Sequence, residues 1–283
     1  MLTRPERARP APTASAVAVA TAPPPPAVCA CGRKPADGFP TCCKSCPYVF
    51  KQLGVYGHTA KCDIAHDDGM SRPWYWRLSD LHISEGTTHN EEQSAYVTEM
   101  GTKLLQKTLP SVQVRRTVRV EDDNLWKRYA ARRAAVRKKK VPPFDGDPPE
   151  TLALLDYSAK KTLDRSVNEA WFFHGTSEDA ARSIGTSDFR LPGHAGLFGK
   201  GLYFADEAIK SNGYSQQNAD GEKVMMLCRV ILGKTLKVTG TDRQAENRIR
   251  GTDYDSLQGK TNHREFLVYD NSLVYPEYIM FYK

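Results

Sequence analysis

The segment Trp171–Tyr214 constrains the fold more than any other part of the chain. It opens with the apolar run WFF, which is too short for a helix and suits a buried strand. Thr176, three residues before Asp179, predicts the N-cap of a helix that continues to about Ile184. We therefore expect a strand followed at once by a helix.

Two residues, His174 and Gly175, fall between that strand and that helix. Backbone N–H groups are free at such a turn, and a glycine lets a ligand approach the backbone closely. A glycine-rich loop then leads to a second strand over residues 201–205, and a second helix carries Ser211 toward Tyr214. The segment predicts a ligand site at its first turn.

A glutamate near the C-terminus is the second constraint. Glu265 stands between the apolar residues of a predicted strand over residues 264–269. Burying a carboxylate without a partner is costly, so a glutamate in this pattern indicates a functional site.

These segments carry a family resemblance. The chain contains, in order, the motifs HGT, GKGLYFA, S..Y, HREFLVYD and YPEYIMFYK. In this order they resemble the catalytic domain of the poly(ADP-ribose) polymerases, the diphtheria-toxin-like ADP-ribosyltransferases, and most closely the tankyrase-like branch. The resemblance covers residues from about 90 to 283. It implies an α+β fold in which two facing, mostly antiparallel sheets surround an NAD cleft, with a small zinc-stabilised module in front. Tankyrase-like members carry a zinc site in this half, but only Cys228 remains here, so we expect no metal in the catalytic domain.

The resemblance also assigns the site. His174, Tyr203 and Glu265 would be the catalytic residues, with His174 on the adenosine ribose and Glu265 on the 2′-hydroxyl of the nicotinamide ribose. Gly175 and Ser211 would hold the nicotinamide amide, between stacked tyrosine rings. The residues expected to bind NAD are His174, Gly175, Thr176, Arg190, Lys200, Tyr203, Ser211 and Tyr214, with His194 also beside the pyrophosphate.

Cleavage of the nicotinamide–ribose bond passes through an oxocarbenium-like transition state, and its cationic leaving group needs no general acid. Positioning and a negative charge beside the cation are what a site can supply. We therefore expect ADP-ribose transfer from NAD to protein side chains, on acceptor proteins that include the chain itself. Because members with the His–Tyr–Glu set can elongate, Glu265 favours poly(ADP-ribose). Mono-ADP-ribosyl transfer and a non-enzymatic adaptor that binds NAD or nucleic acid are the alternatives, and residues 243–261 would border the acceptor site.

Cysteines cluster at the other end of the chain. Of seven, all but one lie between residues 29 and 62, which indicates metal binding in a reducing compartment. The pairs Cys43/Cys46 and His58/Cys62 have the spacing of a tetrahedral zinc site. The alternates are Cys29, Cys31 and Cys42, which could replace a member of this quartet or hold a second ion with His66. Three roles remain open for this module: nucleic-acid contact, protein docking and structural support alone.

We expect the chain to divide into a disordered Ala/Pro/Arg-rich tail (1–28), a zinc module (29–66), a linker (67–90) and the catalytic domain (91–283). A transit peptide is the alternative for the tail. The linker aromatics are expected to pack on that domain, with a platform that stacks bases or ADP-ribose as the alternative. No apolar run approaches the ~20 residues that a membrane helix needs, so no membrane partner is expected. The net charge of +7 suits a polyanionic partner or an anionic cofactor, and equally a basic protein without one. The nucleus and the cytoplasm both fit, with the nucleus favoured.

Within the catalytic domain, the periodicity predicts a helix over 91–109, a strand over 112–120 and a helix from 124 through the basic run at 132–140. That run predicts a solvated face, with nucleic-acid contact or nuclear import as alternatives. A short helix is expected over 151–163, strands over 224–232, 235–239 and 272–282, and a loop with one helical turn over 243–261.

Overall fold

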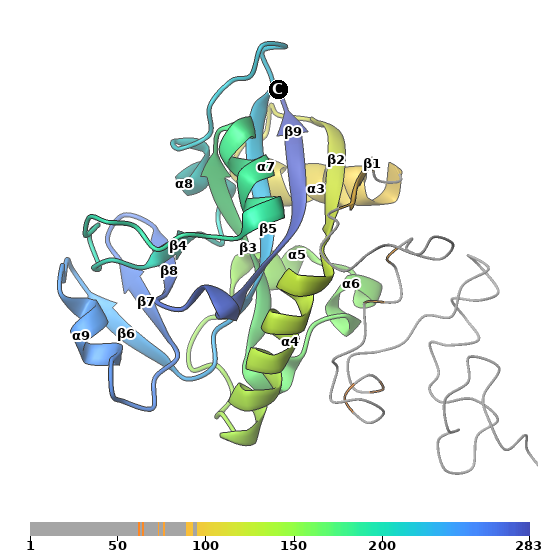
Figure 1. Ribbon diagram of the computed structural model, residues 1–283. Helices are drawn as coiled ribbons and strands as arrows, with labels where there is room; N and C mark the ends of the chain where they lie inside the picture. Colours follow the sequence, from red (N-terminus) through yellow and green to blue (C-terminus); the bar gives the residue numbers. More distant parts are fainter. Residues whose placement is uncertain (1–61, 63, 65–72, 74–75, 77–88, 93–94) are drawn as a thin grey trace, which may run out of the picture.

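The computed structural model describes residues 62, 64, 73, 76, 89–92 and 95–283 (Figure 1). The predicted tail, and nearly all of the predicted zinc module and linker, lie outside these residues. The predicted domain boundary at residue 91 divides a strand, because β1 covers His89–Glu92.

The larger sheet has five strands in the order β1-β2-β9-β5-β3, with every neighbouring pair antiparallel. Its strands after β1 are β2 (Val114–Glu121), β3 (Glu169–Thr176), β5 (Lys223–Ile231) and β9 (Val274–Tyr282). All nine residues of β9 are buried, because this central strand has a strand on each side and helices over its faces. Apolar residues on both faces match this double burial.

The smaller sheet has four strands in the order β4-β8-β7-β6, and only its β6–β7 pair is parallel. Its strands are β4 (Leu202–Phe204), β6 (Thr235–Thr239), β7 (Ser256–Lys260) and β8 (Arg264–Val268). A backbone bridge between Phe173 and Ala205 joins the two sheets, with N–O distances of 2.8 and 3.0 Å. The expected mostly antiparallel two-sheet α+β architecture is confirmed.

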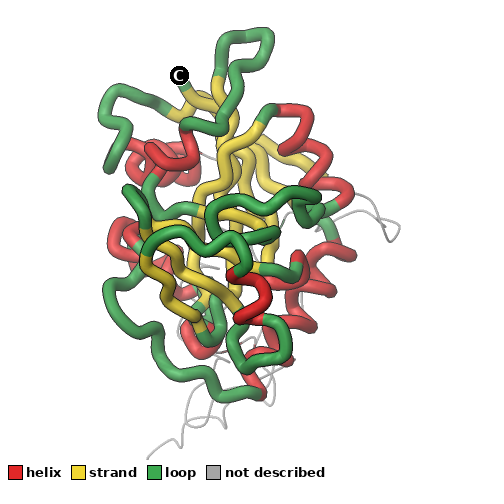
Figure 2. Tube along the Cα trace, turned by 90° about the vertical axis from the view of Figure 1, so that its left-hand side faces the viewer, coloured by secondary structure: helices red, strands yellow, loops and turns green. Residues whose placement is uncertain are grey.

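Helices flank the strands (Figures 1 and 2). They are α3 (Ala95–Gln106), α4 (Asp123–Lys138), α5 (Glu150–Leu154), α6 (Tyr157–Lys161), α7 (Glu178–Ser187), α8 (Ala208–Asn212) and α9 (Ala245–Ile249), with 3-10 turns η1 (Arg165–Val167) and η2 (Asn271–Leu273). Asp122 caps α4 by accepting a hydrogen bond from the N–H of Leu125 at 2.8 Å. Trp76, from the predicted linker, packs on Trp126 and Tyr275 in the core, as expected for this one of the linker aromatics, whereas residues 74 and 75 lie outside the described residues.

The basic side of α4 is not simply a solvated face. Its cations pair with carboxylates of the same domain: Arg132 with Asp270 (3.3 Å), Arg137 with Asp164 (2.7 Å) and Lys139 with Asp255 (2.5 Å). Arg133 is 5% exposed. The run therefore ties α4 to other parts of the domain, which a charge count could not reveal.

Several predicted elements differ in their bounds. Residues 91–92 are in β1 rather than in the following helix, and Tyr96, predicted on the apolar stripe, is half exposed and donates to Asp156. The single helix predicted over 151–163 is two helices, α5 and α6. Strand β7 was not predicted, because its sequence SLQGK has little apolar alternation.

Among the described residues, no helix is both long and apolar enough to cross a membrane. The same part of the chain contains no group of three or more His, Cys, Asp or Glu residues placed to hold a metal ion.

Candidate active site

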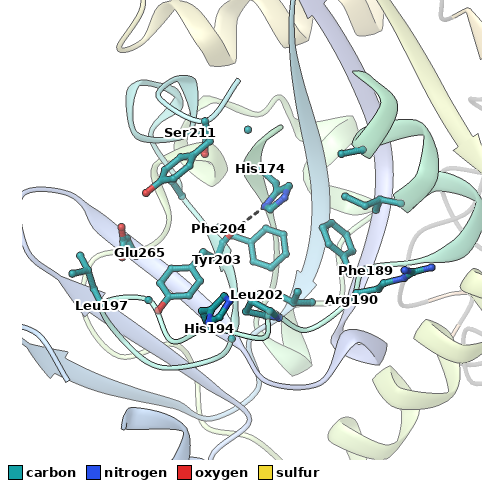
Figure 3. A pocket seen from close by; sticks show the side chains of 18 of the residues that line it. His174, Phe189, Arg190, His194, Leu197, Leu202, Tyr203, Phe204, Ser211 and Glu265 are labelled. Atoms are coloured by element: carbon teal, nitrogen blue, oxygen red, sulfur yellow. Dashed lines mark hydrogen bonds between the residues drawn. The ribbon is translucent and has the colours of Figure 1, made fainter. Parts of the chain in front are cut away.

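A cavity of about 680 Å³ opens where β3, β4 and β8 meet α7 and the C-terminal end of α8. His174, Tyr203 and Glu265 all line it, although they come from three different strands (Figure 3). The side of the cavity opposite Ser211 is formed by Phe189 and Arg190.

His174 lies within β3 rather than in the predicted turn, because the ladder to β5 continues through Thr176. Ser177, not Thr176, caps α7 by accepting a hydrogen bond from Ala180. The His174 Nδ1 lies 3.0 Å from the Tyr203 carbonyl. Since a carbonyl can only accept, Nδ1 carries the proton and the neutral ring leaves Nε2 as an acceptor. Burial lowers the pKa of His174, against the opposing effect of the Tyr203 hydrogen bond, and so favours this neutral form.

Gly175 is also in the ladder, opposite Met225. A Cβ on Gly175 would lie 1.8 Å from the Ser211 carbonyl oxygen, so only glycine lets α8 approach β3 this closely. The Ser211 hydroxyl donates to the Phe173 carbonyl at 3.1 Å, and its lone pairs stay available. Gly175 and Ser211 therefore form a narrow corner of the cavity whose polar groups suit an amide.

Tyr203 is held by its hydroxyl, which donates to the Gly199 carbonyl (2.9 Å) and accepts from the Phe198 N–H (2.8 Å). Burial raises its pKa to about 12, with a further contribution from the charge of Glu265. The phenol is therefore protonated at neutral pH. Its fixed ring offers a flat wall on which an aromatic ligand can stack.

Glu265 is 3% exposed, and its Oε1 forms an ion pair with Lys210 of α8. Its Oε2 is buried with no hydrogen-bond partner among the described residues. Burial opposes the charge of Lys210, but the hydrogen bond and charge of Glu265 outweigh it and raise the pKa of Lys210. A buried carboxylate oxygen without a donor is costly, and in a cavity wall it fits a ligand that supplies a hydroxyl.

Most of the predicted NAD-binding set faces this cavity. His174, Gly175, Arg190, Tyr203, Ser211 and Tyr214 line it, as does His194, whereas Thr176 and Lys200 are not among its lining residues. The Lys200 backbone N–H instead donates to Glu246 at 3.3 Å. Sequence reasoning missed Lys210, Asp188 and Phe189. For Lys210, its position one residue before Ser211 was the available signal.

The predicted zinc quartet cannot be assembled from the described residues. Cys43, Cys46 and His58 lie outside them, as do the alternates Cys29, Cys31 and Cys42, and of the quartet only Cys62 is described, as a buried residue. The zinc module stays a prediction.

The poly(ADP-ribose) polymerase catalytic domain family matches residues 97–264. Mouse protein mono-ADP-ribosyltransferase PARP11 is 24% identical over 247 residues, which cover 77% of this chain and 66% of PARP11. Human protein mono-ADP-ribosyltransferase PARP12 is 26% identical, over 78% of this chain and 29% of PARP12. A probable poly [ADP-ribose] polymerase of Dictyostelium discoideum is 27% identical over 61% of this chain and 45% of its own length. The chain thus spans at most about two thirds of these relatives.

The family match covers more than half of the chain and includes β3, β4 and every residue that lines the cavity except Glu265. It stops at Arg264, one residue before the glutamate of the cavity wall. Together with the geometry of His174 and Tyr203, it establishes that this chain belongs to the poly(ADP-ribose) polymerase catalytic domain family.

Proposed function

We propose that the chain is an NAD⁺-dependent protein ADP-ribosyltransferase that attaches single ADP-ribose units to protein side chains. The observation that carries the transferase assignment is the buried, unpartnered Oε2 of Glu265 in the same cavity as His174 and Tyr203. A ribose hydroxyl would satisfy this oxygen, and the carboxylate would face the developing positive charge of the sugar.

The chemistry follows from the residues. Gly175 and Ser211 would hold the nicotinamide amide, and Tyr203 would stack on its ring. The bond between nicotinamide and ribose breaks with its electron pair on the ring nitrogen, so neutral nicotinamide leaves. A nucleophilic oxygen or other side-chain atom of the acceptor then bonds to ribose C1′ and loses its proton, to Glu265 or to water.

Transfer of single units is supported by the relatives PARP11 and PARP12, which are both named as mono-ADP-ribosyltransferases. Polymer synthesis is the second candidate, because Glu265 occupies the strand position that the family resemblance associates with elongation. The acceptors that we propose are proteins, including the chain itself.

A gel of the purified chain incubated with labelled NAD⁺ tests both steps. Wild type is compared with Glu265→Gln and with Glu207→Gln, a nearby glutamate that pairs with His263 and does not line the cavity. We expect one sharp labelled band for wild type and Glu207→Gln, and about 100-fold less label for Glu265→Gln, the loss typical of removing a group that stabilises transition-state charge.

A high-molecular-weight ladder from wild type would replace the mono-transfer proposal with polymer synthesis. Full labelling by Glu265→Gln would refute the assigned role of Glu265. NAD⁺ binding without any labelling would favour the adaptor alternative.

A further inference from the structure

Asp188 adopts a backbone conformation that residues with side chains rarely take. It ends α7 with φ 77° and ψ 167°, a region occupied almost only by glycine. Such strain persists only where the surrounding contacts over-determine it, and it concentrates at active sites and ligand clamps. Asp188 is also the first residue of the loop that lines one side of the cavity.

Two side chains from distant elements hold the Asp188 carboxylate. Arg128 of α4 forms an ion pair with its Oδ2. Asn271, in the turn between β8 and β9, donates to the same oxygen at 2.8 Å and to the Phe189 carbonyl at 3.0 Å. Asp188 is 6% exposed. We call Asp188, Arg128 and Asn271 the clamp.

The clamp fixes the next residues of the loop. Phe189 is 3% exposed and lies edge-on to His174, with ring centroids 5.2 Å apart and planes at 87°. It also contacts Phe204, at 5.7 Å. Phe189 and Arg190 lie on the side of His174 that faces away from Ser211 (Figure 3). The clamp therefore sets the wall opposite the corner that suits nicotinamide.

We infer that the clamp residues are positioning residues, which hold the loop after α7 in the conformation that binds the adenosine half of NAD⁺. The inference rests on the proposed function for the identity of the ligand. Without the clamp the loop samples other conformations, and the apparent affinity falls by the fraction that remains competent. A competent fraction of about one tenth raises KM roughly tenfold. The kcat at saturating NAD⁺ changes by less than about twofold, because the reacting groups are untouched.

Asp188→Gly is the decisive variant, since glycine adopts this φ without strain and only the carboxylate is removed. The matched control is Lys138→Ala, an exposed cation on the same helix as Arg128. Four readouts are compared with wild type: melting temperature, amide hydrogen exchange over residues 189–196, the KM and kcat for NAD⁺, and calorimetric affinities for ADP-ribose and for nicotinamide.

For Asp188→Gly we expect a melting temperature within a few degrees of wild type, because relief of the backbone strain offsets most of the lost ion pair and hydrogen bond. We also expect faster exchange over residues 189–196, and roughly tenfold weaker ADP-ribose binding with a matching rise in KM. Nicotinamide affinity should change by less than about twofold, because its corner is formed by Gly175 and Ser211. Arg128→Ala should give the same pattern, and the double variant should be no worse than either single one, since both remove one interaction.

Unchanged exchange and unchanged ADP-ribose affinity in Asp188→Gly would overturn the clamp. An equal loss of nicotinamide and ADP-ribose affinity would overturn it as well, by indicating general loosening. If wild type bound neither NAD⁺ nor ADP-ribose, the proposed function would fail, and the exchange comparison alone would decide the clamp.

Discussion

Replacing Gly175 with alanine tests how closely β3 and α8 must approach. The added Cβ would lie 1.8 Å from the Ser211 carbonyl oxygen and 2.8 Å from the Ser211 carbonyl carbon. An ordinary contact is about 3.5 Å, so roughly 1.7 Å must be absorbed. Both atoms are backbone, and no side-chain rotation can relieve the overlap. The C-terminal end of α8 must therefore move away from β3.

That movement displaces two cavity residues, Ser211 and Lys210. Lys210 is the ion-pair partner of Glu265. A displacement of about 1 Å can cost on the order of 100-fold in rate. We therefore expect Gly175→Ala to lower kcat/KM for NAD⁺ by at least about 100-fold. Overpacking of a well-packed region costs about 1–3 kcal/mol, and at roughly 3 °C per kcal/mol the melting temperature should fall by about 3–9 °C.

The assay is labelled-NAD⁺ turnover together with a thermal melt. Gly193→Ala is the control for stability, because a Cβ at Gly193 meets nothing within 4 Å, and it should leave the melting temperature near wild type. Wild-type kinetics for Gly175→Ala would refute the reasoning, since they would mean that α8 can retreat without disturbing the site. A large loss of stability in the Gly193→Ala control would also undermine the comparison.

Two further predictions concern His174 and Tyr203. Burial lowers the pKa of His174 below its usual 6.5, so the unfolded chain binds more protons below about pH 6.5 and the folded state loses stability there, by at most about 1.4 kcal/mol per pH unit. The variant His174→Asn should lack this part of the pH dependence of the free energy of unfolding, which urea unfolding at pH 7.5 and 5.5 measures. An equal pH dependence in both proteins would contradict a lowered pKa of His174. Tyr203→Phe removes the two hydrogen bonds to Phe198 and Gly199. It should destabilise the fold by about 1–3 kcal/mol, as measured by thermal melts. It should also raise KM for NAD⁺, as measured by initial rates. An unchanged KM would mean that the loop does not depend on the tyrosine hydroxyl.

Local pattern was enough to predict most of the strands. Residues 235–239 were predicted as a strand and form β6, and residues 224–232 differ from β5 by one position at each end. Such runs are readable because burial on a sheet demands apolar residues at successive or alternate positions. Strand β7 was missed, since SLQGK owes its place to pairing with β6 and β8 rather than to its own composition.

The sequence alone, through its motifs and the family resemblance, predicted three of the residues that line the candidate site. The motif HGT, the tyrosine of GKGLYFA and the glutamate of REFLV follow one another in a fixed order. That order can be recognised in the sequence without knowledge of the fold. His174, Tyr203 and Glu265 line one cavity as predicted. The zinc module remains a prediction from the sequence, which a metal analysis of the purified chain would test.

Only the tertiary structure decided how those residues are held. The ion pair between Lys210 and Glu265, the contact that forbids a side chain at Gly175, and the contacts of the clamp on Asp188 join residues that are 36 to 83 positions apart. Local sequence periodicity does not predict these contacts, because they depend on how the two sheets and their helices pack. The strained backbone of Asp188 is the clearest case: its sequence neighbours do not require that conformation, and partners from α4 and from the turn after β8 hold it.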